Sequence, residues 1–403
     1  TETTTIGDTI GTERVENLPV NGRDFTLLLA TVPGSVQTGN FFQTSINGVP
    51  TWFGQSVLVD GIDAGRGDLN GISNTLGRID ARVNRISMDS IQEVQVLEQT
   101  YSAQYGQAIG AIINPITKSG TNDLHGGLFE YFRHDRLDAN DFFANARGVG
   151  KTKFRLNQFG GNLSGPLVRD RLFFFANYEG VRQSQGTVLQ GLVPTQAFRA
   201  TFKPALAPVL AKLPLPNGPL SPSDPRLGLF TKIETRRLRE DTGSVKLDYH
   251  LSERDQFSLR YNIDDSETIT PYGIAKDQIA PGSLRVQLFK FSHTHTFSGS
   301  KVNEFAVGLN RNVTYPQGGD MSLPIFNFTF ADAAIAGPGP ALFSQFRATT
   351  VVQFLDTLSV VRGNHSLKFG TDIRLNRRAA RVDQQDTLIF FSVDDFANNA
   401  PFI

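Results

Sequence analysis

The feature that most constrains this chain is the alternation of short and long connections between strand-like segments after Gly120. Within each segment, apolar and polar side chains alternate with a period of two, which is typical of strands with one buried face. The short connections are residues 165–171, 252–255, 298–301 and 362–365. The long ones are residues 135–155, 183–242, 265–283 and 314–349. Transmembrane barrels are built in this way, with tight turns at one rim and long loops at the other.

Nine strands are expected, near residues 126–134, 156–164, 172–182, 243–251, 256–264, 284–297, 302–313, 350–361 and 366–379. Strands joined by four residues must form hairpins, so we expect a sheet in sequential antiparallel order. Charged side chains fall on the face opposite the apolar one: Lys246, Asp248, Arg260, Asp264, Lys368, Asp372 and Arg374. In a barrel that face lines a wet or filled lumen. A soluble β-sandwich would also alternate, but it would not be expected to sort its loops by length.

The first 120 residues follow a different pattern, in which short helices and strands are mixed. Phe25 to Ala30 reads as a short helix that follows a turn at Asn21 to Asp24. Strands are expected at residues 56–59, 91–97 and 108–117, the first of them closed by the turn dipeptide Asp60-Gly61. We therefore expect an α+β domain at residues 1–120, followed at residues 121–403 by the strands of an incomplete antiparallel transmembrane β-barrel.

Composition excludes several classes of function. Lys plus Arg equals Asp plus Glu at 39 each, so no general basic field favours nucleic-acid binding. The chain has no cysteine, which removes disulfides, thiolate chemistry and cysteine zinc sites. No apolar run approaches the ~20 residues that a membrane-spanning helix requires.

Three stretches carry a family resemblance. Ile91 to Leu97, Tyr101 to Gly106 and Gly110 to Gly120, preceded by Val57 to Gly61, resemble the plug domain of TonB-dependent outer-membrane receptors. Further stretches are similar to the Oar-like branch of that family: Asn157 to Gly161, Gly165 to Leu167, Phe173 to Phe175, Tyr178 to Gly180 and Arg362 to Gly370. The resemblance runs from about Val15 to about Asp394, and its strength lies in the order and spacing of the pieces.

The resemblance implies a plug at residues 1–120 and the N-terminal part of a barrel at residues 121–403, in the outer membrane of a bacterium. It implies ligand-gated active uptake of an extracellular ligand, energised by the inner-membrane TonB complex, in contact with the lipid bilayer. It implies no cofactor, and the ligand is not identified. Such barrels use about 22 strands, so we expect this chain to be a fragment whose gene continues beyond Ile403. Neither a TonB box nor a preceding carboxypeptidase-regulatory-like domain is seen before Val15.

By analogy with the family, we expect a lock of charges between plug and barrel. Glu130 and Glu179 lie opposite the neighbouring aromatic residues, so both are expected to point into the lumen, toward Arg82 and Arg85 of the plug. A buried charge without a partner is costly, which favours such a pairing. The alternative is that the two arginines lie on a solvated loop.

We find no catalytic site in the sequence and expect no enzyme. A Gly-x-Ser-x-Gly elbow is absent, and adjacent acids such as Asp264-Asp265 point to opposite faces of a strand. The stretch Gly148 to Thr152 resembles a phosphate-binding loop, but it lacks the first glycine and the flanking strand and helix. His293 and His295 share one face of a strand, but no third ligand is evident, so an interfacial aromatic girdle explains them without a metal.

Two other functions stay open at this point. One is a surface receptor or adhesin, in which the loops bind a partner and nothing is imported. The other is a soluble, β-rich carbohydrate-binding protein, which cell fractionation would distinguish from a membrane protein.

Overall fold

The structure is a computed structural model of the chain. It describes residues 6–37, 44–50, 54–65, 86–99, 101–140, 142, 145, 150–276, 278–316, 322–328, 339, 344–383 and 386–402. Among these residues no helix is both long and apolar enough to cross a bilayer.

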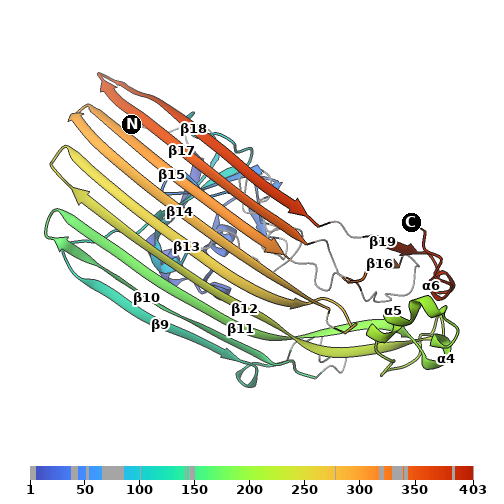
Figure 1. Cartoon of the computed structure of the whole chain (residues 1–403). Helices are drawn as coiled ribbons and strands as arrows, with labels where there is room; N and C mark the ends of the chain where they lie inside the picture. The colour runs from blue at the N-terminus through green and yellow to red at the C-terminus, as the bar shows by residue number, and fades with distance from the viewer. Residues whose placement is uncertain are drawn as a thin grey trace.

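A nine-stranded antiparallel sheet, which we call the wall, makes up most of the molecule (Figure 1). Its strands are β9 His125–His134, β10 Phe154–Val168, β11 Leu172–Pro194, β12 Leu227–His250, β13 Asp255–Pro271, β14 Ile279–Ser298, β15 Lys301–Pro316, β17 Gln345–Arg362 and β18 His365–Val382. They pair in sequential order, and the expected hairpin of β12 with β13 is confirmed. The wall is not closed, because β9 and β18 each have one neighbour among the described residues.

Burial in the wall is the reverse of that in a soluble sheet. On β13, Arg260 and Asp264 are buried at 1% and 2% exposure, whereas Leu259 and Tyr261, on either side of Arg260, are each 39% exposed. The polar face lies against the N-terminal domain and the apolar face is open. A sheet whose outer surface meets hydrocarbon needs this arrangement, so the pattern agrees with a membrane wall.

Two strands are much longer than the sequence predicts. β11 and β12 stay paired as far as Pro194 and Leu227, over nearly half of the expected long loop at residues 183–242. In this extension the side chains are largely polar on both faces of β12, for example Lys232 and Glu234 on one face and Thr235 and Arg237 on the other. Strands that project beyond the bilayer need no apolar outer face, so the alternation that marks a membrane strand is lost there.

The N-terminal domain lies behind the wall in the view of Figure 1. Its main sheet has the order β1-β7-β8-β5-β6, with β1 Ile6–Ile10, β5 Gln55–Val59, β6 Ile62–Asp63, β7 Ile91–Gln99 and β8 Ala111–Thr117. A smaller sheet holds β2 Ser35–Gln37, β3 Thr44–Ile46 and β4 Val49–Pro50. Its helices are α1 Thr12–Asn17 and the 3-10 turns η1 Asn21–Arg23, η2 Phe25–Thr31 and η4 Met88–Ser90. The expected helix at Phe25 is thus a 3-10 helix, begun by Asp24, whose side chain accepts a hydrogen bond from the Thr26 amide.

The long loops meet in a small folded unit, the loop cap, at the rim opposite the short turns (Figure 1). It contains α4 Gln196–Arg199, η6 Pro204–Leu206, α5 Ala207–Lys212 and α6 Val393–Ala397, and the parallel strands β16 Ile325–Phe328 and β19 Thr387–Phe390. A further short helix, η5 Asp135–Leu137, follows β9. Phe198, Phe390 and Phe396 are buried together in the core of the loop cap. Loops that are distant in sequence therefore share one apolar core.

Candidate functional site between the N-terminal domain and the wall

One row of wall residues makes several of the polar contacts with the N-terminal domain. Each member is the direct register partner of the next across β12, β13, β14, β15, β17 and β18. Directly paired residues lie on the same face of a sheet, so all six face the domain. We call them the anchor row: Lys246, Arg260, Lys290, Gly308, Gln353 and Arg374.

The anchor row meets the turn between β5 and β6. Asp60 and Gly61 at this turn have φ values of +48° and +81°. An Asp-Gly pair tolerates such left-handed backbone, which is why this dipeptide marks tight hairpins. The hairpin thereby presents Asp60, Ile62 and Asp63 to the wall.

Asp60 contacts both the wall and the neighbouring strand of its own domain. Its carboxylate lies 3.2 Å from Nε of Arg260, whose side chain is 2% exposed, and its backbone carbonyl accepts a hydrogen bond of 2.7 Å from Nζ of Lys290. The amide and hydroxyl of Thr117 donate to the same carboxylate at 2.8 and 2.7 Å. Burial alone would raise the pKa of Asp60, but Arg260, Lys246 and Lys290 outweigh it and hold this pKa below its ordinary value.

Asp63 makes a second charged contact. Its carboxylate accepts a hydrogen bond of 2.8 Å from Arg374, and its amide donates one of 2.8 Å to Oε1 of Gln353. Arg374 also pairs with Asp372 on its own strand, at 2.8 Å. Burial raises the pKa of Asp63 above its ordinary value, and the shared arginine only partly opposes this shift.

Between these two carboxylates, an apolar side chain sits on a glycine of the wall. A Cβ built on Gly308 of β15 would lie 2.3 Å from Cγ2 of Ile62. Ile62 is 2% exposed, so it fills the space that the missing side chain leaves. A larger residue at position 308 would push the hairpin away from the wall.

A polar cavity of about 490 Å³ adjoins the anchor row. Its lining includes Asp60, Lys246, Arg260, Lys290, Lys368 and Arg374. These wall residues lie within about a dozen positions of the short turns, so the cavity lies in the half of the wall nearest that rim. The interface is thus partly open on the short-turn side.

A second part of the interface is apolar. Leu284, Val286 and Leu288 of β14 are each 2–3% exposed and join the hydrophobic core of the N-terminal domain. They lie on the loop side of Lys290. The N-terminal domain is therefore held by apolar packing on the loop side of the anchor row and by charged contacts at the anchor row itself.

The expected lock pairs cations of the N-terminal domain with carboxylates of the wall, and the observed contacts of the anchor row have the opposite arrangement of charge. Glu179 does face the N-terminal domain: it is 1% exposed and accepts hydrogen bonds of 2.6 Å from Ser87 and from Gln158 of the wall. Arg82 and Arg85 lie outside the described residues, so their pairing with Glu179 stays a prediction. In the anchor row the carboxylates belong to the domain and the cations to the wall.

The expectation for Glu130 was wrong. Glu130 is exposed and lies on the outer face, whereas its neighbours Phe129 and Tyr131 face the N-terminal domain. The guanidinium of Arg23 lies 4.3 Å from the centre of the Phe129 ring and donates a hydrogen bond of 3.2 Å to the Tyr131 hydroxyl. Aromatic side chains at this strand bind a cation of the domain, so their presence does not mark the lipid face.

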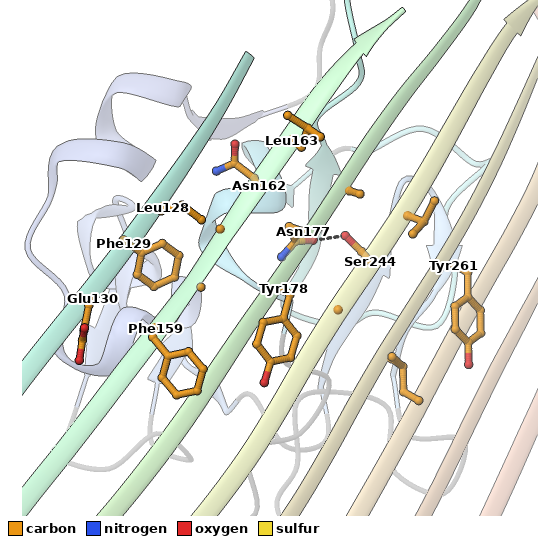
Figure 2. A pocket seen from close by; sticks show the side chains of 16 residues that line it. Leu128, Phe129, Glu130, Phe159, Asn162, Leu163, Asn177, Tyr178, Ser244 and Tyr261 are labelled. Atoms are coloured by element: carbon orange, nitrogen blue, oxygen red, sulfur yellow. Dashed lines mark hydrogen bonds between the residues drawn. The ribbon is translucent and has the colours of Figure 1, made fainter. Parts of the chain in front are cut away.

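The outer face of the neighbouring strands carries an apolar hollow of about 910 Å³ (Figure 2). Its lining includes Gly161 and Gly243 together with Leu163, Tyr178 and Tyr261. Because it opens on the surface that faces the bilayer, this hollow is not on a path through the lumen.

Sequence reasoning missed the roles of Asp60, Asp63, Gly308 and Gln353. It placed Arg260 and Arg374 on the lumen face and Asp60 in a turn, but it sought the cations of the lock in the domain. It also missed a third side chain near His293 and His295: the carboxylate of Asp255 lies 3.0 and 2.7 Å from their ring nitrogens. Of the stretch that resembles a phosphate-binding loop, Gly148 and Val149 lie outside the described residues, and Lys151 donates to the carbonyl of Asp138.

Comparison with known proteins agrees with this architecture. The family model of the outer membrane beta barrel domain matches residues 116–204 and 199–400. The TonB-dependent transporter Oar of Myxococcus xanthus is 27% identical over 114 residues, which are 27% of this chain and 11% of that protein. The probable TonB-dependent siderophore receptor PirA of Acinetobacter baumannii is 28% identical over 123 residues, which are 30% of this chain and 15% of that protein.

Solved structures resemble the chain over nearly its whole length. The outer membrane transporter YddB from Escherichia coli superposes with a TM-score of 0.63 at 14% identity, covering 96% of this chain and 50% of that one. The siderophore receptor PirA from Acinetobacter baumannii gives 0.58 at 15% identity, covering 91% and 47%. The chain thus spans about half the length of these relatives, and at such identity the likeness concerns the fold.

Proposed function

This chain belongs to the outer membrane beta-barrel family and is a TonB-dependent receptor of the bacterial outer membrane, and on this premise we propose that it takes up a ligand actively, with its N-terminal domain as the plug. TonB of the inner-membrane complex would supply the pull on the plug. The extracellular ligand would bind at the side of the loop cap.

The observation that carries the proposal is the anchor row. A domain that merely filled the barrel would be expected to seal it with apolar packing throughout. Here the half of the interface nearest the short turns is instead polar, charged and partly open, around Asp60 and Asp63.

The energetics of such an interface suit a gate. Separating hydrogen-bonded and charged pairs in the presence of water costs only about 0.5–1.5 kcal/mol per neutral hydrogen bond, and somewhat more for charged ones, because water replaces the partner. Separating apolar packing costs free energy for all the area exposed. We therefore propose that the β5–β6 hairpin leaves the anchor row first, while Leu284, Val286 and Leu288 keep the rest of the plug seated.

The ligand class is a matter for uptake assays. The related PirA is named as a siderophore receptor, whereas the name of Oar gives no substrate. Siderophores loaded with radioactive iron are therefore the first probes, followed by peptides and glycans, in a strain that lacks the gene and in one that regains it.

An engineered disulfide tests whether the plug must leave the anchor row. Because the ideal Cβ of Gly308 lies 2.3 Å from Cγ2 of Ile62, and a C–C bond is about 1.5 Å, the two Cβ atoms are at most about 3.8 Å apart. A disulfide needs about 3.5–4.5 Å between Cβ atoms. Residues 1–403 contain no native cysteine, so within them the double variant Ile62→Cys with Gly308→Cys can form only this bond.

Oxidised cells carrying the double variant should lose uptake of the ligand found in the assay, and a reductant should restore it. The single variants Ile62→Cys and Gly308→Cys are the controls, and their uptake should not respond to oxidation. Undiminished uptake by the fully oxidised double variant would contradict the gate. Binding of a ligand at the cell surface without any uptake by the native protein would instead favour a receptor that does not transport.

A further inference from the structure

We propose that Asp255, His293 and His295 bind one divalent transition-metal ion, zinc by preference, on the outer surface of the wall at the rim of short turns. His293 and His295 are two residues apart on β14 and share its outer face. Asp255 begins β13 and is the direct register partner of His295. The three donor atoms lie within 4.8 Å of one another.

The distances fit a metal with little movement. Oδ1 of Asp255 is 3.0 Å from Nε2 of His293 and 2.7 Å from Nδ1 of His295. In a tetrahedral zinc site with bonds of about 2.0–2.2 Å, neighbouring donor atoms are about 3.3–3.6 Å apart. The two contacts of Asp255 would therefore lengthen by about 0.3–0.9 Å to admit the ion. Two imidazoles and one carboxylate are a common three-ligand set for zinc, with a water molecule in the fourth position.

Both imidazole rings are held in place by phenylalanines. Phe257 stacks on His293 with ring centres 4.4 Å apart and an angle of 7° between the planes. Phe297 meets His295 edge-on at 4.5 Å. The aromatic girdle expected at this rim is thus present, and it fixes the orientation of the two ligands.

The carboxylate is also held. The second oxygen of Asp255 accepts a hydrogen bond of 3.0 Å from the hydroxyl of Ser252, in the short turn between β12 and β13. Such a contact leaves Oδ1 free to face the histidines, and groups that orient a ligand in this way raise metal affinity. The three side chains are 27–32% exposed, so water can complete the coordination.

An ion at this position would join the end of β14 to the first residue of β13. Binding to the folded form alone would stabilise the hairpins at this rim. The proposal does not depend on transport, because the site lies on the outer face of the wall and the anchor row on the inner one.

The test uses the protein purified in detergent without a histidine tag and stripped of metal with a chelator. Titration with Zn²⁺ should give one tightly held ion per chain, and Co²⁺ should give the visible absorption of a tetrahedral site. Each of Asp255→Asn, His293→Gln and His295→Gln should weaken zinc binding by about 100-fold or more, and Ser252→Ala, which removes an orienting group, by about 10-fold.

The matched control is His365→Gln, which removes a histidine from the β17–β18 hairpin at the same rim and should leave binding unchanged. Zinc should raise the melting temperature of the native protein and of this control, but not that of the three ligand variants. Equal zinc affinity in His293→Gln and the native protein would overturn the proposal. If a ligand variant does not fold, the native protein still tests the proposal. The absence of a tetrahedral Co²⁺ spectrum in the native protein would overturn the metal site, and the two histidines would then be part of an aromatic girdle only.

Discussion

Asp60 and Asp63 lie in one hairpin, yet their surroundings shift the pKa values of their carboxyl groups in opposite directions. Three wall cations face Asp60 and hold its pKa below the ordinary value, whereas Asp63 shares a single arginine with Asp372 and its pKa is raised by burial. Relative to the unfolded chain, the fold therefore shifts Asp60 toward its charged form and Asp63 toward its neutral form.

This difference predicts unequal costs for two similar substitutions. Asp60→Asn leaves Arg260 buried without its counter-ion and should destabilise the plug by about 3–5 kcal/mol. Asp63→Asn should cost no more than about 1.5 kcal/mol, because Arg374 keeps Asp372 and the amide oxygen can still accept hydrogen bonds. Hydrogen exchange of the β5 and β8 amides in the purified protein measures both effects, with Asp63→Asn as the control. Equal protection in the two variants would contradict the assignment.

The pH dependence follows from the same shifts. Because the pKa of Asp60 is lowered in the fold, its contribution to stability is present above its ordinary pKa and is lost as the pH falls through the lowered value. Because the pKa of Asp63 is raised, its contribution is present below its ordinary pKa and is lost as the pH rises through the raised value. In the native protein, acidification should therefore loosen the hairpin at Asp60, and Asp60→Asn should remove this acid sensitivity.

At the scale of residues, the sequence could predict which wall side chains face inward, but not which residues of the N-terminal domain they contact. Period-two alternation has only two phases, and the charges at Arg260, Asp264 and Arg374 set the phase correctly. On β9 the aromatic residues set it wrongly, because Phe129 and Tyr131 face Arg23. Contacts between residues some 200 positions apart, such as Asp60 with Arg260, depend on how the plug is docked, which no local pattern encodes.

Among the elements, strand existence and order were predictable, whereas strand length was not. Short turns require hairpins, so four of the eight neighbouring strand pairs followed from the turns. The other four pairs, joined by long loops, followed from the sequential strand order that is typical of transmembrane barrels. The extensions of β11 and β12, the pairing of β16 with β19 and the loop cap lie beyond the alternating segments. They are stabilised by contacts between loops, which leave no periodic signal in the sequence.

The loop cap depends on its phenylalanine core. Phe396 is fully buried, and its ring centre lies 5.0–5.3 Å from those of Phe202, Phe328 and Phe390. Phe396→Ala should destabilise the loop cap by about 3–5 kcal/mol, because it leaves a cavity among packed rings. Trypsin added to intact cells should then cleave faster in the described loop segment 195–226. The matched control Phe402→Ala, at a residue 65% exposed, should leave the cleavage rate unchanged; equal acceleration by both would show that the loops do not share a core.

At the scale of the whole molecule, the wall is a sheet whose two edge strands need hydrogen-bond partners for their backbone N–H and C=O groups. Among the described residues, β9 and β18 each pair on one side only. An unpaired strand edge exposes N–H and C=O groups that hydrocarbon cannot satisfy. On β18, Leu367, Phe369 and Ile373 are 43–58% exposed, so the outer face near this edge is apolar as well.

We therefore predict that residues 1–403, expressed by themselves, associate through these edges and do not form a stable monomer. Nine strands are too few to close around a plug, since barrel diameter grows with strand number and barrels with a plugged lumen use about 22. An open apolar sheet in water promotes edge-to-edge pairing, and in a bilayer it leaves two rows of unpaired backbone groups. Light scattering coupled to gel filtration, in detergent and in lipid nanodiscs, should show oligomers or aggregates, whereas the protein extracted from outer membranes serves as the control. A monodisperse monomer of residues 1–403 that melts cooperatively would mean that the wall satisfies its edges in some other way, and that the open-sheet architecture is wrong.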